Sequence, residues 1–230
     1  MTIFKKLNLN PSKIILLVLI HLIGFLGIHS DYRLFFLSLS PINLLVSAFI
    51  IFFNEKIPYR LYLSLYFIFY GVEWLGVYSG WPFGTYFYAE ALGIKIFQIP
   101  LIIGVNWLLL LHASQEVITK FLENFSLKVF NKIDESQNSK NTISSISQAI
   151  VKAFLVAALM LLIDYLIEPH AAELDYWHWL NDIIPMNNYL AWLLISFFCS
   201  LILSFAKSPR SSFSVAFSYL IILIMFFYFL

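Results

Sequence analysis

Long runs of apolar residues with almost no charge constrain this 230-residue chain more than any other feature. Several runs extend over about 18–20 residues, the length of helix that crosses the roughly 30 Å hydrocarbon core of a bilayer. Charged residues make up 12% of the chain, whereas soluble domains carry about 25%. The sequence lacks the alternating strands of about 10 residues that a membrane β-barrel requires. It therefore predicts an all-α polytopic membrane protein, with residues 1–230 forming one transmembrane domain.

The apolar runs predict seven transmembrane helices. The first resembles a signal peptide, but no small-residue cleavage site follows it, so we interpret it as an uncleaved helix. The only long polar segment, residues 114–148, is rich in Lys, Glu, Asn and Ser. It predicts a helical extension and a linker outside the bilayer. The predicted spans are 14–28, 34–53, 61–80, 96–112, 149–167, 189–206 and 213–230.

Lysine and arginine are unevenly divided between the two sides that seven spans define. Only Arg33 and Lys95 lie opposite the N-terminus, out of 14 such residues. Because positive charge marks the cytoplasmic side of a membrane protein, we place the N-terminus and the linker at 114–148 in the cytoplasm and the chain in the cell (inner) membrane. We find no internal repeat typical of the inverted halves of transporters. The residues on the N-terminal side are Lys5, Lys6, Lys13, Lys56, Arg60, Lys120, Lys128, Lys132, Lys140, Lys152, Lys207 and Arg210.

Composition excludes several classes of site. Cys199 is the only cysteine, so the chain has neither a disulfide framework nor a thiolate metal site. The net charge of +1 gives no reason to expect a nucleic-acid partner. Aromatic residues make up 19% of the chain. They either pack against lipid and against one another, or line the site of a long apolar or polyene ligand.

Two connections on the predicted outer side combine acids with aromatic residues. The first begins with GVEWLGVYSGWPFGTYFYAE (71–90), which places Glu73 in an apolar helix and then breaks that helix with glycines and Pro82. We interpret Gly80 to Gly84 as a turn. The second connection, 164–192, opens with Asp164 and Glu168, which share one helix face at i, i+4 spacing.

The acids lie at similar predicted depths. At 1.5 Å per residue, Glu73 lies roughly 10 Å below the outer interface and Asp164 roughly 6 Å. An ionisable residue inside a membrane is costly and marks a functional site by default, so we predict Glu73 and Asp164 as functional. A lone His21 in the first span is more typical of a helix-to-helix hydrogen bond than of catalysis. Glu90, Glu173, Asp175 and Asp182 are expected to be solvated loop acids, and the tryptophans and tyrosines could instead form an interfacial belt.

Two signatures occur in order along residues 60–205. The first is E73-WLGVYSGWPFGTYFYAEALG with Ile99-Pro100 and Asn106-Trp107 after it, and its most specific part is the PFGxYxY core at Pro82 to Tyr88. The second signature consists of Asp164, Glu168-Pro169, Trp177, Trp179, Pro185, Asn187 or Asn188, and Trp192. Together the two signatures resemble those of the integral-membrane carotenoid hydratases of the γ-carotene and bisanhydrobacterioruberin hydratase type. The chain departs from that family's pattern at Glu168, where the family usually has Asp, at 182–184, where it has Tyr-Tyr-Gly, and at Ala191, where it has Gly, which leaves the exact substrate open.

The resemblance implies an enzyme that adds water to the terminal double bond of an acyclic carotenoid end group, giving a tertiary alcohol, with no redox cofactor and no metal. Such a reaction needs an acid, aromatic faces that stabilise a cation and a carboxylate that orients and deprotonates water. We hypothesise Glu73 as acid and Asp164 as base with Glu168 in support, and the reverse assignment stays open. The residues expected to bind substrate are Trp74, Trp81, Phe83, Tyr86, Tyr88, Trp107, Trp177, Trp179, Asn187 and Trp192.

The expected partners are a carotenoid in the bilayer, membrane lipids and other carotenoid-pathway enzymes. A carotenoid cyclase is the nearest alternative, since it shares the protonation step but ends in ring closure and proton loss. A prenyltransferase would need an aspartate-rich metal motif with basic residues nearby. Asp164 and Glu168 match such a motif only weakly, and lysine and arginine are nearly absent on that side. A transporter or another non-enzymatic membrane protein is a third alternative, against which the clustered acids and the lack of repeats both count.

Overall fold

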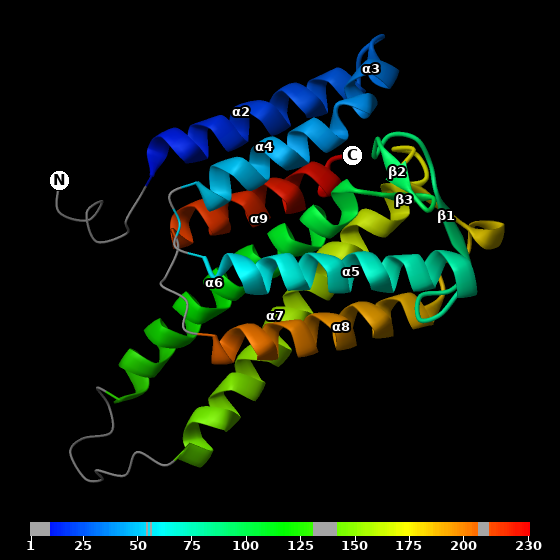
Figure 1. Cartoon of the computed structure of the whole chain (residues 1–230). Coiled ribbons are helices and arrows are strands. Elements are labelled where there is room, and N and C mark those ends of the chain that lie inside the picture. Colours follow the sequence, from blue (N-terminus) through cyan, green and yellow to red (C-terminus); the bar gives the residue numbers. More distant parts are fainter. Residues whose placement is uncertain (1–9, 54, 56, 131–141, 207–211) are drawn as a thin grey trace.

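A computed structural model describes residues 10–53, 55, 57–130, 142–206 and 212–230. This part of the chain is mostly helical (Figure 1), which confirms the predicted all-α class. Its helices are α2 (Pro11–Ile28), α3 (Arg33–Ser38), α4 (Ser40–Phe52), α5 (Tyr59–Ser79), α6 (Ile102–Phe130), α7 (Thr142–Ala171), α8 (Met186–Phe205) and α9 (Phe213–Tyr228).

Five helices in the described part of the chain are long and apolar enough to cross a membrane, by length and composition. They are α2, α5, α8 and the segments Ile102–Asn124 of α6 and Ile146–Ala171 of α7. The apolar helices α4 and α9 are shorter, with 13 and 16 residues. At 1.5 Å per residue these two reach about 20 and 24 Å, less than the roughly 30 Å core. A membrane protein is therefore supported, and the count of seven spans stays a prediction.

Two predicted span boundaries were wrong. The span 34–53 is divided at Leu39, where α3 ends and α4 begins with Pro41 in its first turn. Proline fits there because it lacks the N–H that a helix interior requires. The span 96–112 begins instead at Ile102, because the preceding residues pair as two short strands, β2 (Lys95–Ile96) and β3 (Ile99–Pro100).

Helix α6 lies at the centre of the bundle. It packs against α4, α5, α7, α8 and α9, and Trp107, Leu109 and Leu110 on it are completely buried. Large apolar side chains on the outer helices are instead exposed, among them Phe67 and Phe154. A soluble monomer rarely exposes so much apolar surface, so the arrangement fits a bundle with lipid around it.

A two-stranded sheet joins the two acid-containing connections. Strand β1 (Tyr86–Tyr88) pairs antiparallel with β4 (Trp177–Trp179), in a register that sets Tyr86 opposite Trp179 and Tyr88 opposite Trp177. Successive side chains of a strand point to opposite faces. These four are buried on one face, whereas Phe87 and His178 stack on the other. The strands lie at one end of the bundle in Figure 1, opposite the start of α2.

The turn predicted after α5 is confirmed. The helix ends at Ser79, and Gly80 follows with φ 72°, a left-handed conformation that favours glycine. Gly84 has φ 122°, and a Cβ built there would lie 2.4 Å from Cγ of Pro185. Glycine at position 84 therefore allows this turn to lie directly against the start of α8.

The predicted polar segment 114–148 falls partly within the described residues. Helix α6 continues to Phe130 and α7 begins at Thr142, so the expected helical extension is present on both sides. The remaining stretch, 131–141, lies outside the described part of the chain. So do several cations used to orient the protein: Lys5, Lys6, Lys56, Lys132, Lys140, Lys207 and Arg210.

Candidate active site

Three carboxyl groups from two helices line one small cavity behind the β1–β4 sheet. Glu73 comes from α5, and Asp164 and Glu168 come from one face of α7. Their exposed fractions are 5%, 1% and 4%. The cavity volume is about 20 Å³, enough for about one water molecule. The structure thus brings together the three acids that the sequence singled out.

Glu73 accepts hydrogen bonds from three side chains. The hydroxyls of Tyr86 and Tyr88 donate to its Oε2 at 2.5 and 2.6 Å, and Nε1 of Trp107 donates to its Oε1 at 2.7 Å. Burial, with the adjacent Glu73 as a second cause, raises the pKa of Tyr86 and the pKa of Tyr88 well above the usual value. Both hydroxyls therefore keep their protons at neutral pH. Because a hydroxyl can donate or accept, this environment accommodates Glu73 either with or without a proton.

Glu168 is surrounded by N–H donors alone. Nε1 of Trp177 and Nε1 of Trp179 donate to its Oε2 at 3.1 and 2.7 Å, and Nδ2 of Asn188 donates to its Oε1 at 2.7 Å. An indole N–H cannot accept a hydrogen bond, so a proton on that Oε2 would face two donors. The site around Glu168 is consequently built for the carboxylate.

Asp164 has fewer donors than either glutamate. Nδ2 of Asn188 donates to its Oδ2 at 3.2 Å. Its Oδ1 is buried and has no hydrogen-bond partner among the described residues. A buried oxygen without a donor is costly when it carries charge, and a carboxyl group that carries its own proton reduces that cost. Asn188 thus links Asp164 to Glu168 through a single amide nitrogen.

Local sequence explains why these groups converge. Asp164 and Glu168 lie four residues apart on α7, so they point the same way, and the two-residue period of β1 turns Tyr86 and Tyr88 toward Glu73.

Trp107 is held by ring stacking on both sides. Its ring lies 3.6 Å from that of Trp192, at an interplanar angle of 11°, and 4.9 Å from that of Phe69.

The predicted substrate-binding residues divide into two groups. Phe83, Tyr86, Tyr88, Trp177, Trp179 and Trp192 line the cavity, and Trp107 contacts Glu73 beside it. Trp74 and Trp81 are 45% and 67% exposed, Asn187 is also exposed, and none of these three lines the cavity.

Asn188 lines the cavity, where the sequence predicts that Asn187 binds substrate. Asn188 and Trp192 are four residues apart and therefore share a helix face, a spacing that could have selected Asn188 from the sequence. Ile103 and Ile167 also line the cavity, and no sequence signal marked them. Asn106, which stands in the first signature before Trp107, lines the cavity as well.

The remaining acids of the two connections lie elsewhere. Glu90 pairs with Lys95 at 2.9 Å and Glu173 with Arg33 at 3.1 Å, and both glutamates are exposed, as is Asp182. Asp175 is half-buried and accepts the backbone N–H of Glu90 at 3.0 Å. None of these four acids lines the cavity of the carboxyl cluster, and Glu90, Glu173 and Asp175 instead bind other parts of the chain.

The three acids have no basic side chain as a partner within the described part of the chain. No group of three or more His, Cys, Asp and Glu side chains there is arranged to hold a metal ion. No ion pair of its lysines and arginines reaches Glu73, Asp164 or Glu168. Uncompensated buried charge is expensive, so the cluster is suited to hold at least one proton. Whether the site works without a metal stays a prediction.

The fold and the site define an all-α membrane protein with buried carboxyl groups suited to acid–base chemistry. A family model described as "Carotenoid biosynthesis protein" matches residues 38–230, and the chain belongs to this family. The resemblance seen in the sequence is thereby confirmed at the level of a carotenoid-pathway membrane protein. No curated protein and no solved structure matches the chain.

Proposed function

We propose that the protein is a carotenoid hydratase, a hydro-lyase that adds water to the terminal C=C bond of an acyclic carotenoid end group. One observation carries this proposal. Three buried carboxyl groups surround a cavity with room for about one water, and aromatic rings form much of its wall. Membership of the carotenoid biosynthesis family supports the pathway and the class of substrate.

The hydrogen-bond pattern favours Asp164 as the acid. Its Oδ1 lacks a donor, so Asp164 is the carboxyl group best suited to carry a proton in the resting state. Glu73 serves as the base, because its tyrosine partners accommodate both of its protonation states. Glu168, which receives only N–H donors, remains a carboxylate throughout. Of the two assignments that the sequence left open, this is the reverse one.

The reaction then proceeds in two steps. Asp164 transfers its proton to the less substituted carbon of the terminal double bond, and the π electrons form the new C–H bond. This leaves a tertiary cation on the neighbouring carbon. Water attacks that cation and forms the C–O bond while Glu73 takes the proton that the water releases. A proton shift from Glu73 to Asp164 through a newly entered water restores the resting state, so the net change is the addition of one H₂O.

Aromatic rings and one fixed anion stabilise the cation. The rings of Phe83, Tyr86 and Trp179 line the cavity, and the faces of such rings attract cations by about 0.5–2 kcal/mol each. The Glu168 carboxylate adds a full negative charge that no described lysine or arginine neutralises. Trp74 and Trp81 are exposed and have no part in this step.

The setting of the enzyme belongs to the same proposal. We place residues 1–230 as one domain in the cell (inner) membrane, with the N-terminus in the cytoplasm and the site in the outer half of the bilayer. Figure 1 supports a site at one end of the helix bundle. The strands β1, β2 and β3 lie at the end away from the C-terminus of α6 and the N-terminus of α7. The carotenoid enters from the surrounding lipid, and other carotenoid-pathway enzymes supply it and take the product.

Product mass in a carotenoid-producing host tests this function. We expect the chain, expressed in cells that make lycopene or γ-carotene, to yield a product heavier by one water. A product of unchanged mass with a ring would show a cyclase instead. Glu73→Gln and Asp164→Asn should each abolish the product, whereas Glu90→Gln, at an exposed acid of the same connection, should not. If no product is heavier by one water, or if both cluster variants keep full activity, the proposal is wrong.

A further inference from the structure

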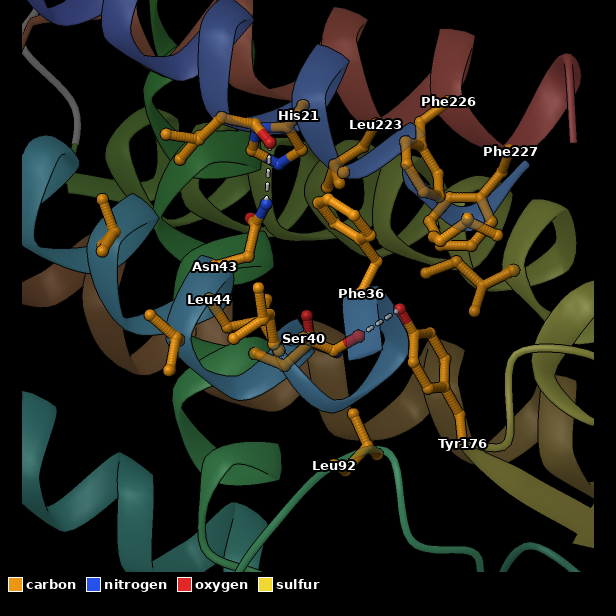
Figure 2. Close-up of a pocket in the computed structure, with 18 of the residues that line it drawn as sticks. His21, Phe36, Ser40, Asn43, Leu44, Leu92, Tyr176, Leu223, Phe226 and Phe227 are labelled. Carbon is orange, nitrogen blue, oxygen red and sulfur yellow. Dashed lines mark hydrogen bonds between the residues drawn. The ribbon is translucent and has the colours of Figure 1, made fainter. Parts of the chain in front are cut away.

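A second, larger cavity lies directly beside the acid cluster. Its volume is about 260 Å³, and it is lined by residues of α2, α4 and α9 on one side and of α6 and α7 on the other. Figure 2 shows His21, Asn43, Leu223 and Phe226 around it. Building on the proposed function, we propose that this cavity holds the stretch of isoprenoid chain adjoining the end group that reacts at the acid cluster.

The two cavities share part of their walls. Ile103 and Asn106 of α6, Ile167 of α7 and Trp177 of β4 line both of them. A single layer of side chains, with no intervening helix, therefore separates the larger cavity from Glu73, Asp164 and Glu168. Trp177 also donates a hydrogen bond to Glu168 at 3.1 Å, so a ligand that displaces this ring reaches the carboxyl groups directly. Ile103, Ile167 and Trp177 are buried, so these side chains must rearrange when the end group passes from the larger cavity to the carboxyl groups.

The larger cavity opens toward lipid. Ile23 on α2 and Ile42 on α4 line it, and each is 55% exposed. Both belong to apolar helices whose outer surfaces carry further exposed apolar side chains, such as Leu26 and Leu45. An opening with such a rim admits a ligand from the hydrocarbon region and excludes a charged one from water. This matches a substrate that is dissolved in the bilayer.

Most polar side chains of the lining already have hydrogen-bond partners within the protein. The imidazole Nδ1 of His21 donates to the carbonyl of Leu17 at 2.8 Å. Asn43 donates to the carbonyl of Ile20 at 3.4 Å, and Ser40 and Tyr176 are hydrogen-bonded to each other at 3.3 Å (Figure 2). Apart from Asn106, aliphatic and aromatic side chains form the rest of the wall. The cavity consequently fits a thin apolar chain better than a ligand with polar substituents.

The size of the cavity limits how much of the chain it holds. Pockets that enclose a whole small-molecule ligand measure about 300–1,000 Å³, so about 260 Å³ accommodates only a segment of a carotenoid. The remainder of the polyene extends through the opening into lipid. One end of the substrate is thus inside the protein while the other stays in the membrane.

Gly24 offers a way to fill the cavity without disturbing its wall. It lines the cavity, and the nearest atom to a Cβ built there is Asn43 Nδ2 at 3.8 Å, an ordinary contact. We expect Gly24→Leu to lower conversion of the long polyene at least tenfold, and to reduce the pigment that co-purifies with the protein by a similar factor. The matched control is Gly71→Leu on α5, where an added Cβ meets no atom within 4 Å and no cavity is lined. It should retain both within twofold.

A substitution at the opening guards against misfolding at Gly24. Ile42→Trp narrows the mouth at an exposed position, and Ile15→Trp is its control on α2, where Ile15 is 57% exposed and outside the lining. The same four variants are tested on 6-methylhept-5-en-2-one, which has the reacting end group without the chain. Gly24→Leu and Ile42→Trp should convert this short substrate as well as their controls do.

The outcomes separate this inference from the proposed function. The inference is overturned if Gly24→Leu and Ile42→Trp handle the polyene like their controls. It is equally overturned if they lose the short substrate together with the long one. Co-purified pigment does not depend on the reaction, so pigment lost in Gly24→Leu and retained in Asp164→Asn supports the cavity even where no hydrated product forms.

Discussion

Asn188 gives the most direct test of the carboxyl cluster, because one amide nitrogen serves two acids. Its Nδ2 lies 2.7 Å from Oε1 of Glu168 and 3.2 Å from Oδ2 of Asp164, and its side chain is almost completely buried. Asn188→Leu keeps the number and branching of the side-chain heavy atoms and removes both hydrogen bonds. A hydrogen bond to a charged group contributes about 1.5–3 kcal/mol, which at 1.4 kcal/mol per factor of ten corresponds to a rate about 10 to 150 times lower. We expect kcat for hydration to fall by that factor.

The assay measures product heavier by one water, per amount of folded protein, in membranes from a carotenoid-producing host. Asn187→Leu is the matched control, because Asn187 is the preceding residue of α8 and is exposed. It should keep the wild-type rate. The reasoning is refuted if Asn188→Leu, with an unchanged melting temperature, hydrates at the wild-type rate. It is also refuted if Asn187→Leu loses as much activity as Asn188→Leu does.

Three further predictions concern a donor, a turn and the orientation in the membrane. Tyr88→Phe removes the hydroxyl that donates to Glu73 at 2.6 Å and should lower kcat by about 10 to 150 times. The control Tyr78→Phe, at an exposed tyrosine of α5, should keep the wild-type kcat. If the two variants have the same kcat, the result counts against Glu73 as the base. Gly84→Ala introduces a Cβ 2.4 Å from Pro185 at a φ of 122°. It should cost about 1–3 kcal/mol of stability, seen as a lower Tm in detergent, while Gly71→Ala leaves Tm unchanged. A membrane-impermeant maleimide added to intact cells should label Asp182→Cys, on the proposed outer side, but not Asn124→Cys, on the proposed cytoplasmic side. Both positions are exposed and Cys199 is buried, so labelling reports the side of the membrane. The opposite pattern would reverse the proposed topology.

The helices and their class were predictable because they depend on local sequence. A run of about 20 apolar residues is costly to unfold in lipid, where each unpaired backbone group costs several kcal/mol. The run therefore becomes a helix almost regardless of its neighbours, as α5 and α8 show. Shorter elements are less determined by length, and the division of 34–53 at Leu39 and the pairing of β2 with β3 were both missed.

The candidate site was predictable in its acids and less so in its walls. Glu73, Asp164 and Glu168 stand out in the sequence because charge is rare in a span. Asn187 and Asn188 are adjacent, and only the rotation of α8 about its axis decides which one faces the acids, since neighbouring helix residues point about 100° apart. The same argument applies to Trp74, which follows Glu73 directly yet is 45% exposed.

By itself, therefore, the sequence determined that this is a helical membrane protein with rare carboxyl groups in its apolar segments, because the length of an apolar run and a lone charge within it can both be read from one segment. Only the tertiary structure decided what those carboxyl groups contact. Tyr88 and Trp177 meet across a two-stranded sheet although they lie 89 positions apart in the sequence, and α2, α4 and α9 enclose a cavity beside the acids. Such contacts depend on how distant helices pack and rotate against one another, which no single stretch of the chain specifies.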